Sequence, residues 1–385
     1  MHVVFLPKYY PGRGDVQLGE FIRRHAQAVA AVAQVSVVAV LKDTATATGY
    51  YEEVSEENGV WTLRAYYRPL ERGWALWRTP LNFLRYRKAA DRAWQRFLRE
   101  RGLPLVCHVQ VLTRPSLLAY KAKKELGIPY AITEHSSEFL DGRWLGRPWL
   151  NRWFTRRAFA KAGAVSVVSE RLGRAIRDLG LVELYEVIPN VLPLERTSVA
   201  QRGPAHHAIM VADLVDRVKN VSGVLECMAL LRNELPDLKL TIVGGGEDEQ
   251  RLRQRCKGFN LDDRVTFLGQ LSSEEAMQQM AKAGFLIVNS RHETFSVVTG
   301  EALMLGKPVI ATRCGGPESF IDGHNGELVP VDNVPALADA VRRMVAGHHR
   351  YDPDRIRATV DERYSSAWIG QRFLTLYQRM LSDQA

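Results

Sequence analysis

Residues 289–329 read NSRHETFSVVTGEALMLGKPVIATRCGGPESFIDGHNGELV, and this stretch decides the fold class. The apolar run 285–288 before it predicts a buried strand, and residues 297–305 predict an amphipathic helix. A polar loop joins the two. Where a strand of an open α/β sheet ends and a helix begins, unpaired N–H groups and the helix dipole favour an anion. The stretch therefore predicts a phosphate-binding loop.

Carboxylates and glycines surround this loop. Glu293 lies in the loop, and Glu301 follows about one turn into the helix if Ser296 is its N-cap. The next expected strand, 308–312, runs into the turn GGPE at 315–318. Carboxylates accept hydrogen bonds from sugar or ribose hydroxyls, and a glycine backbone lets a phosphate approach closely. The combination is typical of a nucleotide or sugar-nucleotide site.

The stretch resembles the retaining, nucleotide-sugar-dependent glycosyltransferases of family 4, which have the GT-B fold. The resemblance is carried by two glutamates separated by seven residues, by Leu305–Thr312 and by Gly315–Glu318. It implies an α/β protein with two Rossmann-like domains facing a central cleft. The second domain is expected to bind the nucleotide sugar, and the first is expected to bind the acceptor.

The resemblance also assigns roles around the loop. It implies that Glu293 acts in catalysis by contacting hydroxyls of the donor sugar, and that Glu301 holds the ribose. Backbone amides meet the sugar or the phosphate at Thr294, Phe295, Ser296 and Val297. The family commonly has Gly-Phe-Gly where this chain has Thr-Phe-Ser. The loss of both glycines narrows the allowed backbone angles.

Further donor contacts are implied earlier in the second domain. The family places a lysine six residues after an arginine, and both bind the donor diphosphate. Lys219 matches the lysine, but Asp213 occupies the position of the arginine. Arg217 is the hypothetical replacement for that charge. Gly244 and Gly245 follow the next strand, where the family has a Gly-x-Gly beside the nucleotide.

Two places in the first domain also carry expectations. Gly12 and Gly14 follow the first strand but lack the G-x-G-x-x-G spacing of dinucleotide sites. The loop is either a phosphate cradle or a glycine-rich turn, and the resemblance puts it in the cleft. His135 ends the strand 130–135, and the resemblance implies that it approaches the donor sugar as a catalytic residue. The competing interpretation is a structural histidine, as for His25 on the first helix.

Alternating strands and helices predict mainly parallel sheets. The expected strands are 2–7, 35–40, 60–67, 105–110, 130–135, 164–169 and 185–189 in the first domain, and 208–214, 238–246, 265–269, 285–288 and 308–312 in the second. We expect the N-terminal domain at 1–190, a linker at 191–205 and the C-terminal domain at 206–365. The helix at 366–385 returns to the first domain by family precedent.

Composition fits a globular protein, with 46% hydrophobic and 25% charged residues among 385. No apolar run is long enough to predict a membrane-spanning helix. The sequence enters the strand 2–7 without a signal-peptide pattern, so a cytoplasmic location is expected. Four dispersed cysteines without metal-ligand spacing predict buried thiols in a reducing compartment.

The net charge of +9 is uneven, because residues 1–190 contain 29 basic and 18 acidic residues. Two segments combine arginine with tryptophan: 71–101 has nine basic and three acidic residues, and 143–161 has six basic and none acidic. Their tryptophans are Trp74, Trp77 and Trp94, and Trp144, Trp149 and Trp153. This mixture predicts peripheral binding to the anionic inner face of the cell membrane. The alternative is core tryptophans beneath a solvated arginine face. No motif accompanies them that would predict a nucleic-acid partner.

The resemblance implies, as the expected function, retaining transfer of a hexose from a UDP- or GDP-sugar to a glycan or lipid-linked acceptor, in surface polysaccharide biosynthesis. We expect no cofactor and no metal, because Lys219 and a helix N-terminus supply positive charge and no Asp-x-Asp suited to a cation is present. The alternatives are another GT-B enzyme, such as a nucleotide-sugar epimerase or a phosphorylase, and a non-catalytic partner that binds a sugar nucleotide.

Overall fold

The chain forms two compact units in a computed structural model, which describes residues 1–385 except 45–48, 73, 194–201, 361 and 384–385. The N-terminal unit comprises Met1–Val191 and Ser365–Ala385, and the C-terminal unit comprises Leu192–Tyr364. The linker expected at 191–205 falls largely on residues outside those described. Within the described ranges, no helix is long and apolar enough to cross a membrane.

The N-terminal unit is built on an eight-stranded sheet with the order β3-β4-β2-β1-β5-β6-β7-β8. Its strands are β1 His2–Pro7, β2 Gln34–Lys42, β3 Tyr50–Glu57, β4 Val60–Tyr67, β5 Val106–Gln110, β6 Tyr130–Glu134, β7 Ala164–Val167 and β8 Glu186–Val187. All neighbours are parallel except β3 and β4, which form an antiparallel hairpin. The sequence did not predict β3, because this edge strand carries four glutamates and lacks an apolar run.

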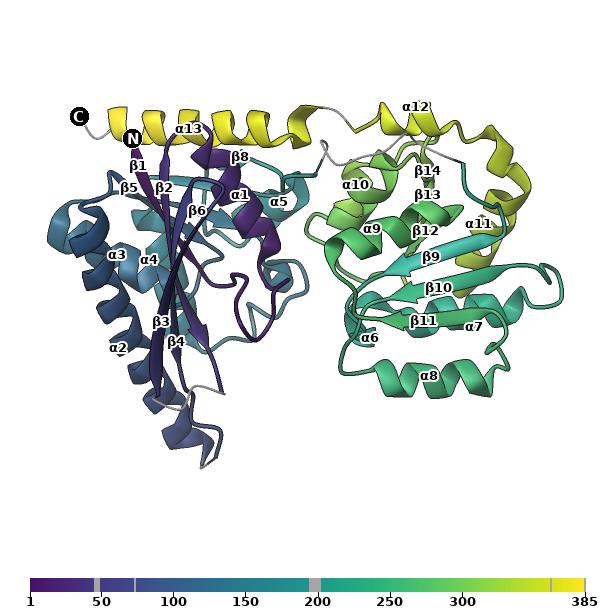
Figure 1. Cartoon of the computed structure of the whole chain (residues 1–385), viewed down its shortest axis with the longest axis horizontal. Coiled ribbons are helices and arrows are strands. Elements are labelled where there is room, and N and C mark those ends of the chain that lie inside the picture. The colour runs from purple at the N-terminus through teal and green to yellow at the C-terminus, as the bar shows by residue number, and fades with distance from the viewer. Residues whose placement is uncertain (45–48, 73, 194–201, 361, 384–385) are drawn as a thin grey trace. The chain divides into compact units, whose positions relative to one another are not determined.

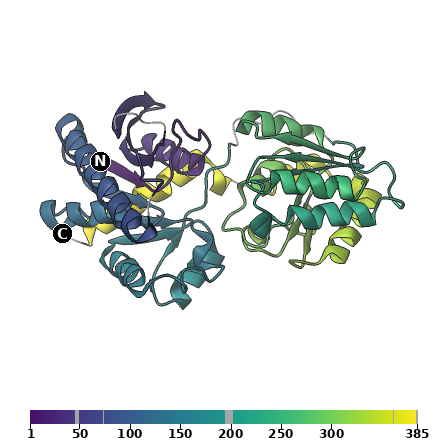
Figure 2. The same ribbon diagram turned by 90° about the horizontal axis from the view of Figure 1, so that it is seen from below.

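Helices cover both faces of this sheet (Figure 1). They are α1 Glu20–Ala30, α2 Ala75–Arg101, α3 Pro115–Leu126, α4 Trp149–Lys161, α5 Glu170–Asp178 and α13 Ser366–Ser382. The C-terminal helix α13 packs beside α1 (Figures 1 and 2). Its Phe373 and Tyr377 share a buried core with Val3 and Phe5 of β1. Arg372 of α13 forms an ion pair with Glu186 of the same unit at 2.6 Å.

Two of the six tryptophans in the Arg/Trp segments belong to this core. Trp94 and Trp144 are 2% and 1% exposed and lie against Phe97 and Phe139 respectively. The expectation that these tryptophans lie at a membrane interface is wrong for both residues, because they fill space beneath their own segments. The other four are exposed.

The C-terminal unit has a fully parallel six-stranded sheet with the order β11-β10-β9-β12-β13-β14. Its strands are β9 His207–Val211, β10 Lys239–Val243, β11 Val265–Gly269, β12 Phe285–Val288, β13 Val309–Thr312 and β14 Gly326–Val329. The first strand in the chain, β9, has β10 on one side and β12 on the other. The strand order therefore reverses between β9 and β12, and open α/β sheets bind ligands beyond the carboxyl ends of the strands at such a switch point. The short edge strand β14 was not predicted.

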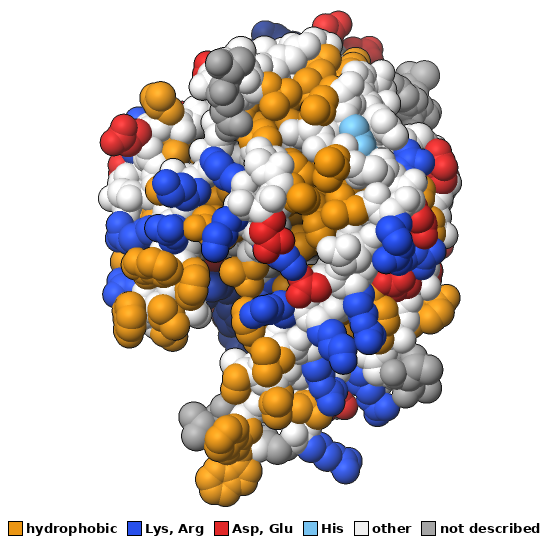
Figure 3. Space-filling view, turned by 90° about the vertical axis from the view of Figure 1, so that its left-hand side faces the viewer, with side chains coloured by type: hydrophobic (Ala, Val, Ile, Leu, Met, Phe, Trp, Pro, Cys, Tyr) orange, Lys and Arg blue, Asp and Glu red, His pale blue; other side chains and the backbone are white. Residues whose placement is uncertain are grey.

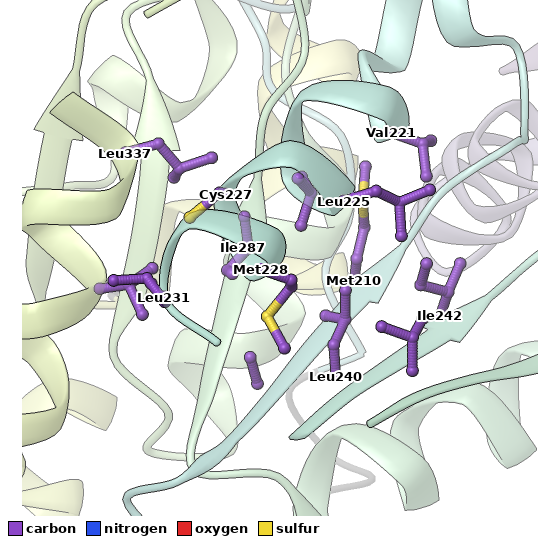
Figure 4. Close-up of a cluster of buried hydrophobic side chains, with 14 of the residues drawn as sticks. Met210, Val221, Leu225, Cys227, Met228, Leu231, Leu240, Ile242, Ile287 and Leu337 are labelled. Atoms are coloured by element: carbon purple, nitrogen blue, oxygen red, sulfur yellow. The ribbon is translucent and has the colours of Figure 1, made fainter. Parts of the chain in front are cut away.

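Helices again flank the sheet on both faces. They are α6 Asp216–Lys219, α7 Val221–Leu230, α8 Glu249–Gly258, α9 Ser273–Lys282, α10 Val297–Met304, α11 Val334–Gly347 and α12 Pro353–Arg357. Leu225 and Met228 of α7 face Met210 and Leu240 of the sheet (Figure 4). The helix α7 is apolar on most sides because α8 and α11 also pack against it.

Two smaller predictions are confirmed. Ser272 and Glu275 form a capping box at the start of α9, with each side chain accepting a hydrogen bond from the backbone N–H of the other. All four cysteines are buried thiols that form no disulfide with one another.

Candidate functional site

Two loops meet at the switch point of the C-terminal unit. Lys219 ends α6, which follows β9, and Glu293 follows β12. The Lys219 Nζ donates to Glu293 Oε1 at 2.7 Å, and Ser290 Oγ donates to the same oxygen at 2.8 Å. The Glu293 backbone donates to the carbonyl of Cys314 and accepts from the amide of Gly316, at 3.0 and 2.9 Å. These bonds join the loops after three strands into one site.

The Lys219 ammonium remains charged in this site. Burial lowers its pKa, but attraction to Glu293 and Asp213 outweighs burial, and the net pKa is raised. An ammonium has three N–H donors, and Glu293 takes one. The second Glu293 oxygen, Oε2, accepts no hydrogen bond from the residues that the structure describes. The pair therefore retains capacity for both an anion and a hydroxyl.

The loop after Glu293 presents backbone donors. Phe295 anchors it, with its ring 5.1 Å from that of Phe320 and 5.9 Å from that of Tyr364. The backbone of Gly316 packs closely against that of Phe295, since a Cβ at residue 316 would lie 2.4 Å from the Phe295 carbonyl carbon. Within the described chain, no hydrogen bond occupies the amides of residues 294–297, which lead into α10. Such amides at a helix N-terminus suit a phosphate.

Only one of the two missing glycines has a structural consequence. Ser296 has φ 67°, in the left-handed region that favours glycine, whereas Thr294 has no positive φ. Ser296 occupies the N-cap position as expected, but its side chain does not cap the helix. Its Oγ instead lies 2.8 Å from Thr299 Oγ1. Glu301 is a buried residue of α10, and Val297 is the first residue of that helix.

The other expected donor contacts lie on neighbouring loops. Arg217 is 65% exposed, and its Nε is 4.0 Å from Glu247 Oε1. The amide of Gly244 donates to the Gly269 carbonyl, and that of Gly245 donates to Gln270 Oε1. A Cβ at Gly244 would lie 1.9 Å from a backbone oxygen. Gly244 thus serves close packing of the loop, and neither glycine amide is unoccupied.

Sequence reasoning missed Arg291, which holds Lys219 in place. Its guanidinium donates to the Asp216 carbonyl at 2.8 Å and to Asn220 Oδ1 at 3.1 Å, on either side of Lys219. It also pairs with Asp332 at 2.8 Å. The available signal was its position in the short loop that follows a buried strand, which it shares with Ser290.

His135 belongs to the N-terminal unit and is held in one orientation there. Its Nε2 donates to Gln110 Oε1 at 2.8 Å, while its Nδ1 is buried without a partner among the described residues. The rings of Phe21 and His25 lie 4.7 and 5.5 Å away. Burial lowers the pKa of His135 well below its usual value, so the imidazole is neutral. His25 is fully buried, and its Nε2 lies 2.9 Å from the Pro189 carbonyl.

Gln110, which the sequence did not indicate, connects His135 to a buried polar chain. Gln110 Nε2 lies 3.2 Å from His108 Nε2. The two His108 nitrogens lie 2.6 Å from Thr133 Oγ1 and from the Tyr377 hydroxyl. The orientation of His135 is therefore set by a network that reaches α13.

A cavity of about 950 Å³ opens at the carboxyl ends of β1, β2, β4 and β5, across the switch point of the N-terminal sheet. Aromatic and basic residues, including Tyr67 and Arg114, share its wall with Gly12 and Gly14. The Gly12 amide donates to the Asp15 carbonyl. His135 is not among the lining residues. A concave site with apolar walls and a few polar groups is typical of ligand binding.

Two family models match the chain. The model for glycosyl transferases group 1 matches residues 195–357, and the model for the glycosyl transferase 4-like domain matches residues 18–191. Together they reach across both units.

Curated relatives agree with these models. The chain is 32% identical to the N-acetyl-alpha-D-glucosaminyl L-malate synthase of Bacillus anthracis, over 43% of this chain and 44% of that protein. It is 24% identical to the alpha-D-kanosaminyltransferase of Streptomyces kanamyceticus, over 86% and 82%. The chain spans 44% and 60% of the lengths of the first two curated relatives it matches.

Solved structures show the same fold. The sucrose-phosphate synthase of Thermosynechococcus elongatus matches with a TM-score of 0.77 at 19% identity, and Anabaena HepE in complex with UDP matches with 0.74 at 19%. Each comparison covers 100% of both chains. With family models matching both units and GT-B proteins sharing the fold throughout, the chain belongs to the glycosyltransferases of the GT-B fold.

Proposed function

We propose that the chain transfers a hexose from a UDP- or GDP-sugar to a glycan or lipid-linked acceptor, with retention of anomeric configuration and without a metal. The observation that carries this proposal is the Lys219–Glu293 pair at the switch point, beside unoccupied amides at 294–297. These adjoining loops hold a cation, a carboxylate oxygen that can accept a hydrogen bond from a hydroxyl, and backbone N–H groups that can donate hydrogen bonds to a phosphate.

In the proposed complex, the diphosphate lies against Lys219 and the amides of 294–297. Glu293 Oε2 accepts a hydroxyl of the hexose, and Glu301 accepts the ribose hydroxyls. UDP is the favoured nucleotide, because Anabaena HepE, which has the same fold, was crystallised with UDP and with UDP-glucose. GDP remains the alternative to be measured against it.

The proposed transfer requires that the nucleoside diphosphate leaving group be stabilised. Negative charge grows on the nucleoside diphosphate as its bond to the anomeric carbon breaks. A half-buried ammonium and fixed amide dipoles stabilise that charge without reorganisation. This local supply of positive charge supports the proposed independence from a metal. Lys219 is suited to the task because it stays protonated.

The cavity of the N-terminal unit is the proposed acceptor site. Its aromatic walls suit the apolar faces of sugars or a lipid, and its basic groups suit a phosphate. His135 retains its proposed role near the transferred sugar, held by Gln110. Assembly of a surface polysaccharide would use such acceptors.

Calorimetry with UDP-, GDP- and ADP-sugars tests the donor site directly. We expect one nucleotide class to bind, and we expect Lys219→Ala to weaken that binding by more than about tenfold, or about 1.4 kcal/mol. A folded protein that binds none of them would overturn the proposed donor site.

A product assay tests the reaction. Incubation of the bound donor with acceptors from surface-polysaccharide pathways, followed by NMR of the new glycosidic bond, should give the donor's anomeric configuration. Activity should survive EDTA. An inverted product would exclude retention, and an epimerised donor without transfer would favour an epimerase.

A further inference from the structure

Two helices of the N-terminal unit expose large apolar side chains to solvent. Near the start of α2, Trp74, Trp77 and Leu84 are 84%, 69% and 54% exposed. On α4, Trp149, Trp153 and Phe154 are 72%, 47% and 47% exposed. We call these six residues the apolar face. Figure 3 views this side of the unit, where hydrophobic side chains gather beside Lys and Arg side chains. Clusters of exposed aromatic residues mark an interaction site.

All the charged residues of these helix segments are basic. Residues 75–90 contain four basic and no acidic residues, and α4 contains another four and none. The charges of Lys88 and Arg152 are uncompensated, since neither side chain makes a hydrogen bond or ion pair with the described residues. The partner of this surface must therefore be apolar and anionic.

The apolar face flanks the cavity described above. Phe83 and Tyr86 of α2 and Leu150 and Phe154 of α4 line that cavity. Both helices thus contribute residues to the cavity wall as well as to the exposed surface. A partner that covers the surface meets the rim of the cavity at the same time.

We propose that the apolar face docks on an anionic lipid bilayer, with the tryptophan rings at headgroup depth and the basic residues against lipid phosphates. Tryptophan has an apolar body and a polar N–H, and arginine matches a phosphate with several donors. Docking brings the cavity to the bilayer surface, so that the headgroup of a lipid-linked acceptor enters it while its hydrocarbon stays in the membrane. The entry of an acceptor headgroup into the cavity rests on the proposed function, but the docking of the apolar face on the bilayer does not.

Charge argues against a second copy of the chain as the occupant. A symmetric dimer through this face would bring eight basic residues against eight. Like charges at an interface repel, whereas an anionic bilayer neutralises them.

Vesicle flotation with the full chain tests the docking. We expect it to bind vesicles of phosphatidylcholine with phosphatidylglycerol, to bind pure phosphatidylcholine weakly, and to dissociate as salt rises. Trp77→Ser with Trp149→Ser should weaken binding at least about tenfold, because two interfacial anchors are lost. Leu184→Ser is the matched control, since Leu184 is 86% exposed outside this face. Equal binding by the double variant and the control would overturn the proposal.

A second pair of variants isolates charge. Lys88→Gln with Arg152→Gln should weaken binding to anionic vesicles, whereas Lys239→Gln with Lys257→Gln removes the same charge from the C-terminal unit and should not. Brominated lipids should quench the exposed tryptophans and leave the buried Trp94 and Trp144 unquenched. Sedimentation that shows a dimer dissociated by Trp77→Ser would identify a protein interface instead.

Donor binding separates this proposal from the proposed function. The variants of the apolar face should bind the nucleotide sugar in calorimetry as the native protein does, because the donor loops belong to the other unit. Normal donor binding without vesicle binding overturns only the docking. Vesicle binding without donor binding overturns only the donor site.

Discussion

The Lys219 ammonium and the Glu293 carboxylate lie 2.7 Å apart, although 74 residues separate them in the chain. Lys219 follows β9 and Glu293 follows β12, the two neighbouring strands between which the strand order reverses. Each group keeps part of its bonding capacity. The ion pair therefore holds the two loops together while leaving a cation and an acceptor for a ligand.

Replacement of Lys219 by alanine should weaken nucleotide-sugar binding by about 10- to 100-fold. A hydrogen bond to a charged group contributes about 1.5–3 kcal/mol, and Lys219 is the cation paired within the site. Calorimetry measures the change, with Lys257→Ala as a lysine deletion on an exposed helix. Equal affinities for the two variants would remove Lys219 from the donor site.

The two glutamates should differ in what they recognise. Glu301→Ala should weaken UDP and UDP-sugar alike, because the ribose is common to both. Glu293→Ala should weaken UDP-sugar more than UDP, because its free oxygen faces the hexose in the proposed complex. Paired titrations with UDP and UDP-glucose measure the difference. The same loss of UDP affinity in both variants would contradict these separate roles.

The sequence predicted the groups whose positions follow from local order. Glu293 and Lys219 stand at fixed distances from strand ends, so a motif finds them. The Ser272–Glu275 capping box follows for the same reason, since it needs only four consecutive residues.

The sequence could not predict groups defined by tertiary contacts. Arg291 acts through Asp216 and Asn220, about 70 residues away in the chain. Gln110 acts through His135 across two strands. The tryptophan content of the segment also could not distinguish the buried Trp94 from the exposed Trp77, because burial depends on which side of α2 packs on the sheet.

Gly316→Ala should destabilise the C-terminal unit by about 1–3 kcal/mol, the usual cost of overpacking. The added Cβ would lie 2.4 Å from the Phe295 carbonyl carbon, and backbone cannot move aside as a side chain can. Urea unfolding measures the change. Gly323→Ala is the control, because a Cβ there meets nothing within 4 Å. Similar midpoints for both variants would show that the contact relaxes freely.

His135 should affect transfer without affecting donor affinity. His135→Ala should lower kcat by about 100-fold or more if the imidazole assists the reacting sugar, within the range of a positioned catalytic group. Gln110→Ala should lower kcat less, because it only orients His135. Steady-state kinetics and calorimetry together measure both effects. A loss of donor affinity equal to the loss of kcat would indicate a structural role instead.

Three buried histidines should make the N-terminal unit sensitive to acid. Burial lowers the pKa of His25 to about 4 and lowers the pKa values of His108 and His135 well below 6.5. Between pH 6.5 and the lowered pKa values of the folded state, the unfolded chain binds protons at these positions and the folded chain does not. Their stabilising contribution is therefore complete above pH 6.5 and is lost as the pH falls. Each histidine accounts for about 1.4 kcal/mol per pH unit.

Urea unfolding between pH 7.5 and 5 should show this slope, at up to about 4 kcal/mol per pH unit for the three groups together. His25→Gln keeps a donor for the Pro189 carbonyl and removes one titrating group, so it should reduce the slope by about a third. The exposed His324 provides the control, because His324→Gln removes a histidine that is not buried. A slope that is equally steep in His25→Gln and in the native protein would mean that His25 is protonated in the folded state, and that another group drives the acid sensitivity.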